Sequence, residues 1–214
     1  MGTEDGSTRD WIEWHRNYDD PDSRQSWRLR TVRRRIGEAL AAMPGGEVRV
    51  ISLCAGDGRD LLGVLESHAR AADVVALLVE LDPELAARAR TRAARTPAKV
   101  RVVTGDAAVT DTYAAVVPVD LVLVCGVFGN IADEDVATTI RALPGLCRRG
   151  TEIVWTRHRR PPDLVPTVLD WFAGAGFTAL SVDDAPDHAV CVGHCRYAGD
   201  GDRLVLGERW FAFR

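Results

Sequence analysis

Apolar residues gather along this chain in short runs, each bounded by polar or turn-forming residues. A run of roughly four to eight apolar residues between turn signals is typical of a buried strand. The second run, 74–81, is apolar enough to be covered on both of its faces. The strands that these runs predict cover 48–53, 74–81, 99–104, 116–124, 151–156 and 177–182.

Segments with helical spacing of their apolar positions separate the strands. Alternation of strands and helices is typical of a parallel sheet covered on both faces, so we predict one α/β domain. Near the end of the chain, 189–197 and 208–213 have strand-like patterns, which predict an antiparallel partner there. The predicted helices cover 24–43, 59–70, 84–95, 134–146 and 163–173.

The helix predicted at 24–43 carries one apolar stripe and many arginines. Ser23 could cap its start, and Pro44 and two glycines follow its end. We interpret the arginines as a solvated face. The stripe consists of Leu29, Val32, Ile36, Leu40 and Met43, and the arginines are Arg28, Arg30, Arg33, Arg34 and Arg35.

Length and composition narrow the class of protein. The 214 residues suffice for one domain with a proper core, and 46% hydrophobic with 27% charged residues is ordinary for a soluble globular protein. A net charge of −4 gives no indication of nucleic-acid binding. No segment reads as a signal peptide or reaches the ~18 apolar residues of a membrane span. We expect a cytoplasmic protein, monomeric or homodimeric, without a membrane partner.

The cysteines are five in number and form no Cys-x-x-Cys pair, which favours reduced thiols over disulfides. His188, Cys191, His194 and Cys195 could suggest a zinc site. However, 189–196 reads as a strand, on which side chains alternate between the two faces. The two cysteines then share one face and the two histidines the other, so we expect no metal site.

The transition from the first strand to the next helix is the most informative stretch. Strand 48–53 runs into a turn of small residues, 54–58, and helical spacing begins at Arg59. In open α/β sheets such a corner binds nucleotides, because glycine lets the backbone approach the ligand and the helix start offers free N–H donors. Neither Gly-x-Gly-x-x-Gly nor a phosphate loop fits, since glycines are missing and the only lysine is Lys99. Asp57 favours a ligand with a positive end over a pyrophosphate.

The segment Leu-Cys-Ala-Gly-Asp-Gly-Arg at 53–59 resembles the first motif of class I S-adenosylmethionine-dependent methyltransferases, usually Leu-Asp-x-Gly-x-Gly-x-Gly. Ser52 stands where the family often has an acid, and Cys54 replaces the first glycine. Val-Glu-Leu-Asp-Pro at 79–83 and Gly-Asp-Ala at 105–107 resemble later motifs of the family. The resemblance implies a Rossmann-like, doubly wound, mostly parallel seven-stranded sheet, of the small stand-alone bacterial type.

S-adenosylmethionine is the cofactor that this resemblance implies. Glu80, rather than Asp82, would accept the ribose hydroxyl protons, and Asp106 would accept from the adenine amine. A surface acid and a turn aspartate are the alternatives for these two positions. The expected cofactor-binding residues are Tyr18, Cys54, Ala55, Gly56, Asp57, Gly58, Glu80, Leu81, Asp106, Ala107, Cys125 and Gly126.

The expected reaction is methyl transfer to an oxygen or nitrogen of a small organic molecule, with secondary metabolism as a candidate setting. Alignment and exclusion of water can supply much of the catalysis, and a base is needed only for a poorly acidic hydroxyl or a protonated amine. His158 is the candidate base, held neutral by flanking arginines, although an exposed loop histidine is equally consistent. Cys125 lacks the Pro-Cys context of a cytosine-C5 nucleophile. The expected substrate-binding residues are Trp14, His15, Phe128, Asn130 and Arg157.

Residues 1–47 precede the domain at 48–214, and we expect them to form a helical lid over the ligands. The aromatic cluster at 10–18 could instead pack against the helices of the sheet. A non-catalytic domain that binds S-adenosylmethionine is the alternative function, and a nicotinamide oxidoreductase is disfavoured by the missing glycines.

Overall fold

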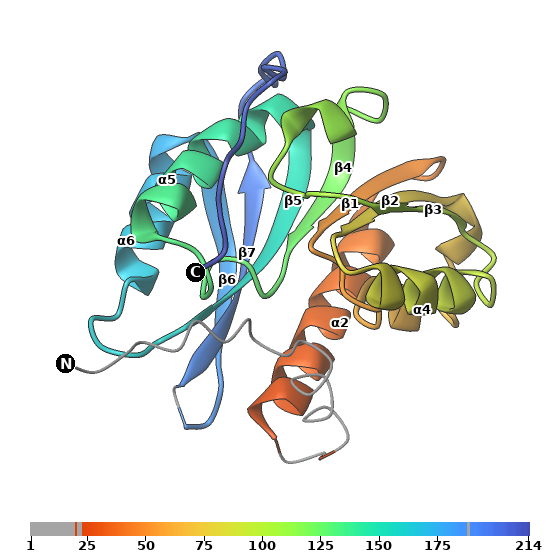
Figure 1. The fold of residues 1–214 in the computed structure, drawn as a ribbon, viewed down its shortest axis with the longest axis horizontal. Helices are drawn as coiled ribbons and strands as arrows, with labels where there is room; N and C mark the ends of the chain where they lie inside the picture. Colours follow the sequence, from red (N-terminus) through yellow and green to blue (C-terminus); the bar gives the residue numbers. More distant parts are fainter. Residues whose placement is uncertain (1–19, 21–22, 188) are drawn as a thin grey trace.

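A computed structural model describes residues 20, 23–187 and 189–214, and Figure 1 shows the fold. Seven strands form one sheet in the order β3-β2-β1-β4-β5-β7-β6. The order reverses beside β1, which has β2 on one side and β4 on the other. The strands are β1 (Val48–Leu53), β2 (Val74–Glu80), β3 (Lys99–Thr104), β4 (Val119–Val124), β5 (Cys147–His158), β6 (Phe177–Asp184) and β7 (Val190–Tyr197).

The paired strands from β3 through β5 run parallel, whereas β7 runs antiparallel to β5 and to β6. The predicted α/β, mostly parallel seven-stranded sheet with one antiparallel strand near the C-terminus is therefore confirmed. β5 begins earlier than the predicted residue 151, because Cys147 pairs with Val119 before an irregularity in the register with β4.

Helices cover both faces of this sheet, and each face has its own apolar cluster. On one face lie α2 (Arg24–Ala42), α3 (Leu61–Leu65) and α4 (Pro83–Ala93); on the other lie α5 (Asp133–Ala142), α6 (Val165–Gly174) and the end of the chain. The predicted helix 59–70 is thus much shorter in the structure. Arg70 lies beyond the end of α3 and donates through its side chain to the carbonyl oxygens of Met43 and Pro44, at 2.8 and 3.0 Å.

The apolar stripe of α2 is part of the core. Val32, Ile36 and Leu40 are each at most 2% exposed and belong to the same cluster as the residues of α3. Ser23 caps the helix, as predicted, by accepting from the N–H of Ser26 at 3.1 Å. The segment expected to form a lid therefore includes, in α2, a helix that belongs to the core layer.

Arg33 and Arg35 of α2 form specific contacts, so the interpretation of the arginines as a merely solvated face is wrong for these two, whereas Arg30 and Arg34 are exposed. Arg33 donates through Nε and Nη2 to the carbonyl oxygen of Arg59, at 2.9 and 2.6 Å. Arg35 makes two hydrogen bonds to the Asp183 carboxylate in β6, at 2.7 Å each. These contacts attach α2 to the glycine turn and to the far edge of the sheet, which no helical spacing could predict.

The prediction of a continuous strand over 208–213 is wrong. Residues 208–214, which we call the C-terminal strap, make only isolated bridges, from Arg209 to Val109 and from Phe213 to Ile131. Because these partners lie on two separate loops, no continuous ladder forms. Trp210 anchors the strap: it is 2% exposed and stacks on Tyr113 with ring centroids 5.8 Å apart.

All five cysteines are free thiols. Cys191 and Cys195 lie in the apolar cluster of one face, while Val192 belongs to the cluster of the other, as strand alternation predicts. His188 lies outside the described residues. Within the described ranges, no three His, Cys, Asp or Glu side chains gather where they could hold a metal ion. The described helices include none with the length and apolar character needed to span a membrane.

Candidate cofactor-binding site

A cavity of about 520 Å³ opens at the carboxyl ends of β1, β2, β3 and β4. Ligands of open α/β sheets bind at this edge, beside the point where the strand order reverses. The structure brings most of the predicted cofactor residues to this one cavity. Those on its wall are Cys54, Ala55, Gly56, Asp57, Glu80, Leu81, Asp106, Ala107, Cys125 and Gly126.

The turn after β1 owes its shape to left-handed backbone conformations. Gly56 and Gly58 have φ values of 58° and 69°, which glycine adopts without a steric penalty. A Cβ on Gly58 would approach Leu62 Cδ1 to 2.6 Å, so this glycine serves close packing of turn and helix rather than the cavity wall. Cys54, with φ of 49°, is the one non-glycine residue with positive φ in the described part of the chain.

Glu80 closes β2 with a buried carboxylate whose two oxygens are both oriented by the backbone. One oxygen accepts from the N–H of Gly56 at 2.7 Å, and the other accepts from the N–H of Asp82 at 2.9 Å. Each carboxylate oxygen has two lone-pair sites, so further donors can still bind. The side chain thereby ties the glycine turn to the end of β2 and retains acceptor capacity toward the cavity.

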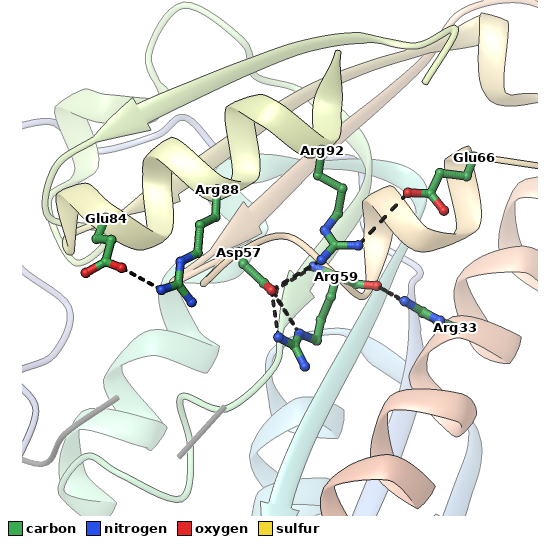
Figure 2. A network of polar contacts seen from close by, with 7 residues as sticks. All are labelled: Arg33, Asp57, Arg59, Glu66, Glu84, Arg88 and Arg92. Atoms are coloured by element: carbon green, nitrogen blue, oxygen red, sulfur yellow. Dashed lines mark hydrogen bonds and ion pairs between the residues drawn. The ribbon is translucent and has the colours of Figure 1, made fainter. Parts of the chain in front are cut away.

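The sequence predicts that Asp57 offers its negative charge to the ligand, but in the structure its carboxylate pairs with two arginines. Its carboxylate pairs with Arg59 at 2.7 Å and with Arg92 at 3.5 Å, and the residue is 4% exposed. Figure 2 shows Asp57 between these two guanidinium groups. The negative charge is therefore neutralised within the protein, and Asp57 contributes chiefly to the shape of the turn.

Asp106 is held from two sides. Its Oδ1 accepts from the N–H of Ala108 at 2.8 Å, and its Oδ2 pairs with Arg209 of the strap at 2.7 Å. Arg209 itself lies on the cavity wall. The strap thus reaches the residue that the sequence assigns to adenine, a contact that only the fold creates.

Several residues on the cavity wall were missed by the sequence reasoning. Asp60 could have been found, because it follows the glycine turn and caps α3. Leu29 and Val32 belong to the predicted apolar stripe of α2 and lie on the cavity wall. Nothing in the stripe distinguishes a residue that faces the cavity from one that faces the core. The strap residues had a strand-like pattern, but nothing in that pattern indicated a place on the cavity wall. The missed residues include Arg28, Leu29, Val32, Asp60, Arg209, Phe211 and Phe213.

His158, the predicted base, ends β5 but is not on the wall of this cavity. Its Nδ1 accepts from the N–H of Arg160 at 3.3 Å. Burial lowers the pKa of His158, and Arg157 and Arg160 lower it further. The ring is thus kept neutral, as its arginine neighbours predict, but the structure does not bring it to the proposed ligands.

The residues after β4 and at the end of β5 that were expected to bind the substrate are held by contacts within the protein. Phe128 is fully buried between Trp155 and Phe172, with ring centroids 6.1 and 6.2 Å away, so it has no face toward the cavity. Arg157 is 6% exposed, donates to the carbonyl oxygen of Phe128 and pairs with Asp133 at 2.9 Å.

Asn130 uses its side-chain amide within the same region, donating to the carbonyl oxygen of Gly126 at 2.7 Å. It therefore holds the backbone of Gly126, which lies on the cavity wall. The remaining predicted contacts, Trp14, His15 and Tyr18, lie outside the described residues. Burial raises the pKa of the Cys125 thiol well above its ordinary range, with Asp60 adding to the rise, so this thiol is not activated as a nucleophile.

No protein-family model matches the sequence, and no curated protein matches it. Solved structures do match the fold. Magnesium protoporphyrin IX methyltransferase from Synechocystis, solved with bound S-adenosylmethionine, aligns with a TM-score of 0.63 and 13% identity over 89% of this chain and 92% of that one. This chain has the class I methyltransferase fold.

Two further neighbours of this methyltransferase fold differ in their named activity. The 1,6-didemethyltoxoflavin-N1-methyltransferase of Burkholderia thailandensis, solved with its substrate and S-adenosylhomocysteine, aligns with a TM-score of 0.59 and 19% identity over 88% of this chain and 87% of that one. The cyclase SpnF aligns with a TM-score of 0.59 and 13% identity over 84% and 85%. The fold therefore establishes architecture, and activity must be argued from the site.

Proposed function

We propose that this protein is an S-adenosylmethionine-dependent methyltransferase that acts on an oxygen or nitrogen of a small organic molecule. The observation that carries the proposal is the Glu80 carboxylate. It is buried at the end of β2, oriented by two backbone N–H groups, and faces a cavity at the edge of the sheet where nucleotides bind.

The residues on the wall suit the adenosine part of this cofactor. Glu80 has lone pairs left for ribose hydroxyls, and Asp106 has lone pairs left for an amine of the base. The turn at 54–58 lets the backbone come close to a ligand. When bound, the cofactor supplies an electrophilic methyl group, so the protein's own part is to position the acceptor and exclude water.

The proposed lid belongs to the segment before α2. Its aromatic residues, Trp14, His15 and Tyr18, would cover the ligands and exclude water. A chain that lacks residues 1–20 should then stay folded and bind S-adenosylhomocysteine, but lose methyl transfer. Unchanged transfer by the shortened chain would contradict the lid role.

A different reaction, or binding without transfer, is the competing function. It is favoured by one observation: a named cyclase shares this fold at a similar TM-score. A single-turnover reaction with radiolabelled S-adenosylmethionine and a set of hydroxyl- and amine-bearing acceptors separates the two, because only a methyltransferase moves the label to an acceptor.

Titration with S-adenosylhomocysteine tests the proposal directly. A ligand that binds only the native state raises the melting temperature, and at about 100 times its Kd it adds about 2.7 kcal/mol of stability. We expect saturable heat of binding in calorimetry and a concentration-dependent rise of Tm. No heat and no shift at millimolar ligand would overturn the proposed function, and NADH serves as the control ligand that should not bind.

A further inference from the structure

The C-terminal strap is joined to the loop that follows β3 by hydrogen bonds of its main chain. The N–H of Thr110 donates to the carbonyl oxygen of Glu208 at 3.1 Å, and the N–H of Glu208 donates to Thr110 Oγ1 at 3.1 Å. The N–H of Trp210 donates to the carbonyl oxygen of Ala108 at 3.0 Å. Because Glu208 and Trp210 are the neighbours of Arg209 in the chain, the strap is fixed to this loop on both sides of Arg209.

Side chains of the same loop and strap pack together. Tyr113 is fully buried and stacks on Trp210, and its hydroxyl donates to the carbonyl oxygen of Ala107 at 2.6 Å. Ala107 lies on the cavity wall, next to Asp106. The loop and the strap therefore form one packed unit that carries part of the wall.

Arg209 is the strap residue whose side chain meets Asp106. Trp210 is 2% exposed whereas the side chain of Arg209 is 55% exposed, as expected when neighbouring residues of an extended segment point to opposite sides. Arg209 Nη1 lies 2.7 Å from Asp106 Oδ2, and both residues line the cavity. The other oxygen of Asp106 accepts from the N–H of Ala108, which orients the carboxylate.

The stability of the strap does not require this ion pair. A pair between side chains that are 55% and 33% exposed contributes little to the free energy of unfolding, because water screens it. The strap already has its anchor in Trp210 and its hydrogen bonds to the loop. The pair adds a guanidinium next to a carboxylate on the cavity wall. Arg59, another arginine of this wall, directs its Nε and Nη2 to Asp57 instead.

A guanidinium next to a carboxylate offers a hydrogen-bond donor beside an acceptor. A guanidinium carries five N–H donors, more than one contact with Asp106 requires, and Asp106 Oδ2 has two lone-pair sites. A 6-aminopurine presents the complementary pattern, an amine that donates beside a ring nitrogen that accepts. A 6-oxopurine has an acceptor in place of the amine, and that acceptor would oppose the carboxylate.

We propose that Arg209 is a specificity-determining residue of the cofactor site. This inference rests on the proposed methyltransferase function, in which a purine binds at Asp106. Asp106 accepts from the 6-amino group of the base, while Arg209 donates to the ring nitrogen beside that group and holds the carboxylate in place. The pair therefore selects adenine over a 6-oxopurine, and the strap is part of the cofactor site.

The test compares two ligands whose purines differ at the 6 position. S-adenosylhomocysteine carries an amine there, and S-inosylhomocysteine carries an oxygen. Calorimetry on the full chain gives both Kd values, and their ratio measures how well the site distinguishes the two bases. Wild-type protein should bind S-adenosylhomocysteine at least about tenfold more tightly, because the oxygen of the other ligand leaves polar groups without a matching partner.

Arg209→Met removes the guanidinium and keeps an unbranched side chain. It should raise the Kd for S-adenosylhomocysteine by about 5- to 20-fold, and the ratio of the two Kd values should fall at least about threefold. The main-chain hydrogen bonds of the strap remain, so the Tm without ligand should stay within about 2 °C of the wild type. Arg203→Met is the matched control, because Arg203 belongs to the same end of the chain but is not on this cavity wall, and it should leave both Kd values unchanged.

Asp106→Asn tests independently whether the base lies at Asp106. The amide oxygen can still accept from the N–H of Ala108, so the amide NH₂ then takes the place of Oδ2. A donor thereby replaces the acceptor that would face the 6 position of the purine. This variant should lose most of the preference for S-adenosylhomocysteine, because a donor suits the 6-oxo group better than the amine.

The other outcomes separate this inference from the proposed function. A wild-type ratio near one, or an unchanged ratio in Arg209→Met, would overturn the specificity role. Equal weakening of both ligands would make Arg209 a packing surface, and tighter binding would make it a group that blocks the site, so either result overturns the role as well. An unchanged ratio in Asp106→Asn would place the base elsewhere, and a fall in Tm of more than about 5 °C in Arg209→Met would make the residue structural.

In each of these cases the wild type still binds S-adenosylhomocysteine, and the methyltransferase proposal stands. If the wild type binds neither ligand, the proposed function itself fails, and the specificity role fails with it.

Discussion

Two groups of residues contribute to the cavity wall, and they come from different kinds of segment. The first group lies at the ends of consecutive strands: the glycine turn after β1, Glu80 at the end of β2 and Asp106 just after β3. The second group comes from α2 and the strap, which lie at opposite ends of the described chain. The first group is a property of local segments, and the second comes together only after the chain has folded.

This difference explains which of the predicted residues the structure brings to the cavity. Each residue of the first group depends on a few neighbouring residues and on the rule that ligands lie at the carboxyl ends of parallel strands. Phe128 and Arg157 were assigned to the substrate by the same rule, but both are buried and bonded within the protein. Residues at strand ends can face the cavity or the core, and packing decides between the two.

Removing the anchor of the strap should have the largest effect. Trp210→Ala deletes a side chain that is 2% exposed and stacked on Tyr113, so it should lower the free energy of unfolding by about 3–5 kcal/mol. Urea denaturation measures this loss. Val205→Ala, 58% exposed in the wild type, is the control and should stay within about 0.5 kcal/mol.

Because Arg209 of the strap pairs with Asp106 on the cavity wall, folded Trp210→Ala should also bind S-adenosylhomocysteine more weakly than the wild type, as read by calorimetry. Stability equal to that of the wild type would show that the strap is not anchored by this ring. Unchanged affinity for S-adenosylhomocysteine would show that the strap does not contribute to cofactor binding.

Removing the carboxylate at the end of β2 should have an intermediate effect. Glu80→Ala should weaken S-adenosylhomocysteine by about 1–3 kcal/mol, roughly 5- to 150-fold in Kd, because charge-assisted hydrogen bonds are lost. Calorimetry measures the change. Glu84→Ala is the control, since Glu84 is exposed in the first turn of α4 and pairs only with Arg88 among the described residues. Unchanged affinity in folded Glu80→Ala would move the ribose contact elsewhere, first to Asp82.

A change at Cys54 should have the smallest effect. Cys54→Gly relieves a left-handed non-glycine residue but makes the unfolded chain more flexible and removes a packed thiol, so the free energy of unfolding should stay within about 1 kcal/mol of the wild type. Cys54→Val should destabilise more, because a branched side chain tolerates this φ poorly. The reverse order in urea denaturation would contradict the role given to the turn.

The sequence by itself determined the α/β class, the strands of the sheet and the glycine turn, because these depend on periodicity and on residues close in the chain. It also identified Glu80 and Asp106, since each interrupts or follows an apolar strand. Asp60 was passed over, although it lies two residues after Gly58 and the structure places it on the cavity wall.

Only the tertiary structure decided how those charges are used. In the folded molecule Asp57 pairs with Arg59 and Arg92, and the strap pairs with Asp106. Arginines of α2 form hydrogen bonds to the glycine turn and to β6. Such contacts join residues that are far apart in the chain, and their geometry follows from packing rather than from any local pattern. The part of the cavity wall that α2 and the strap contribute therefore belongs to the folded molecule, whereas the residues at the strand ends can already be recognised in short stretches of sequence.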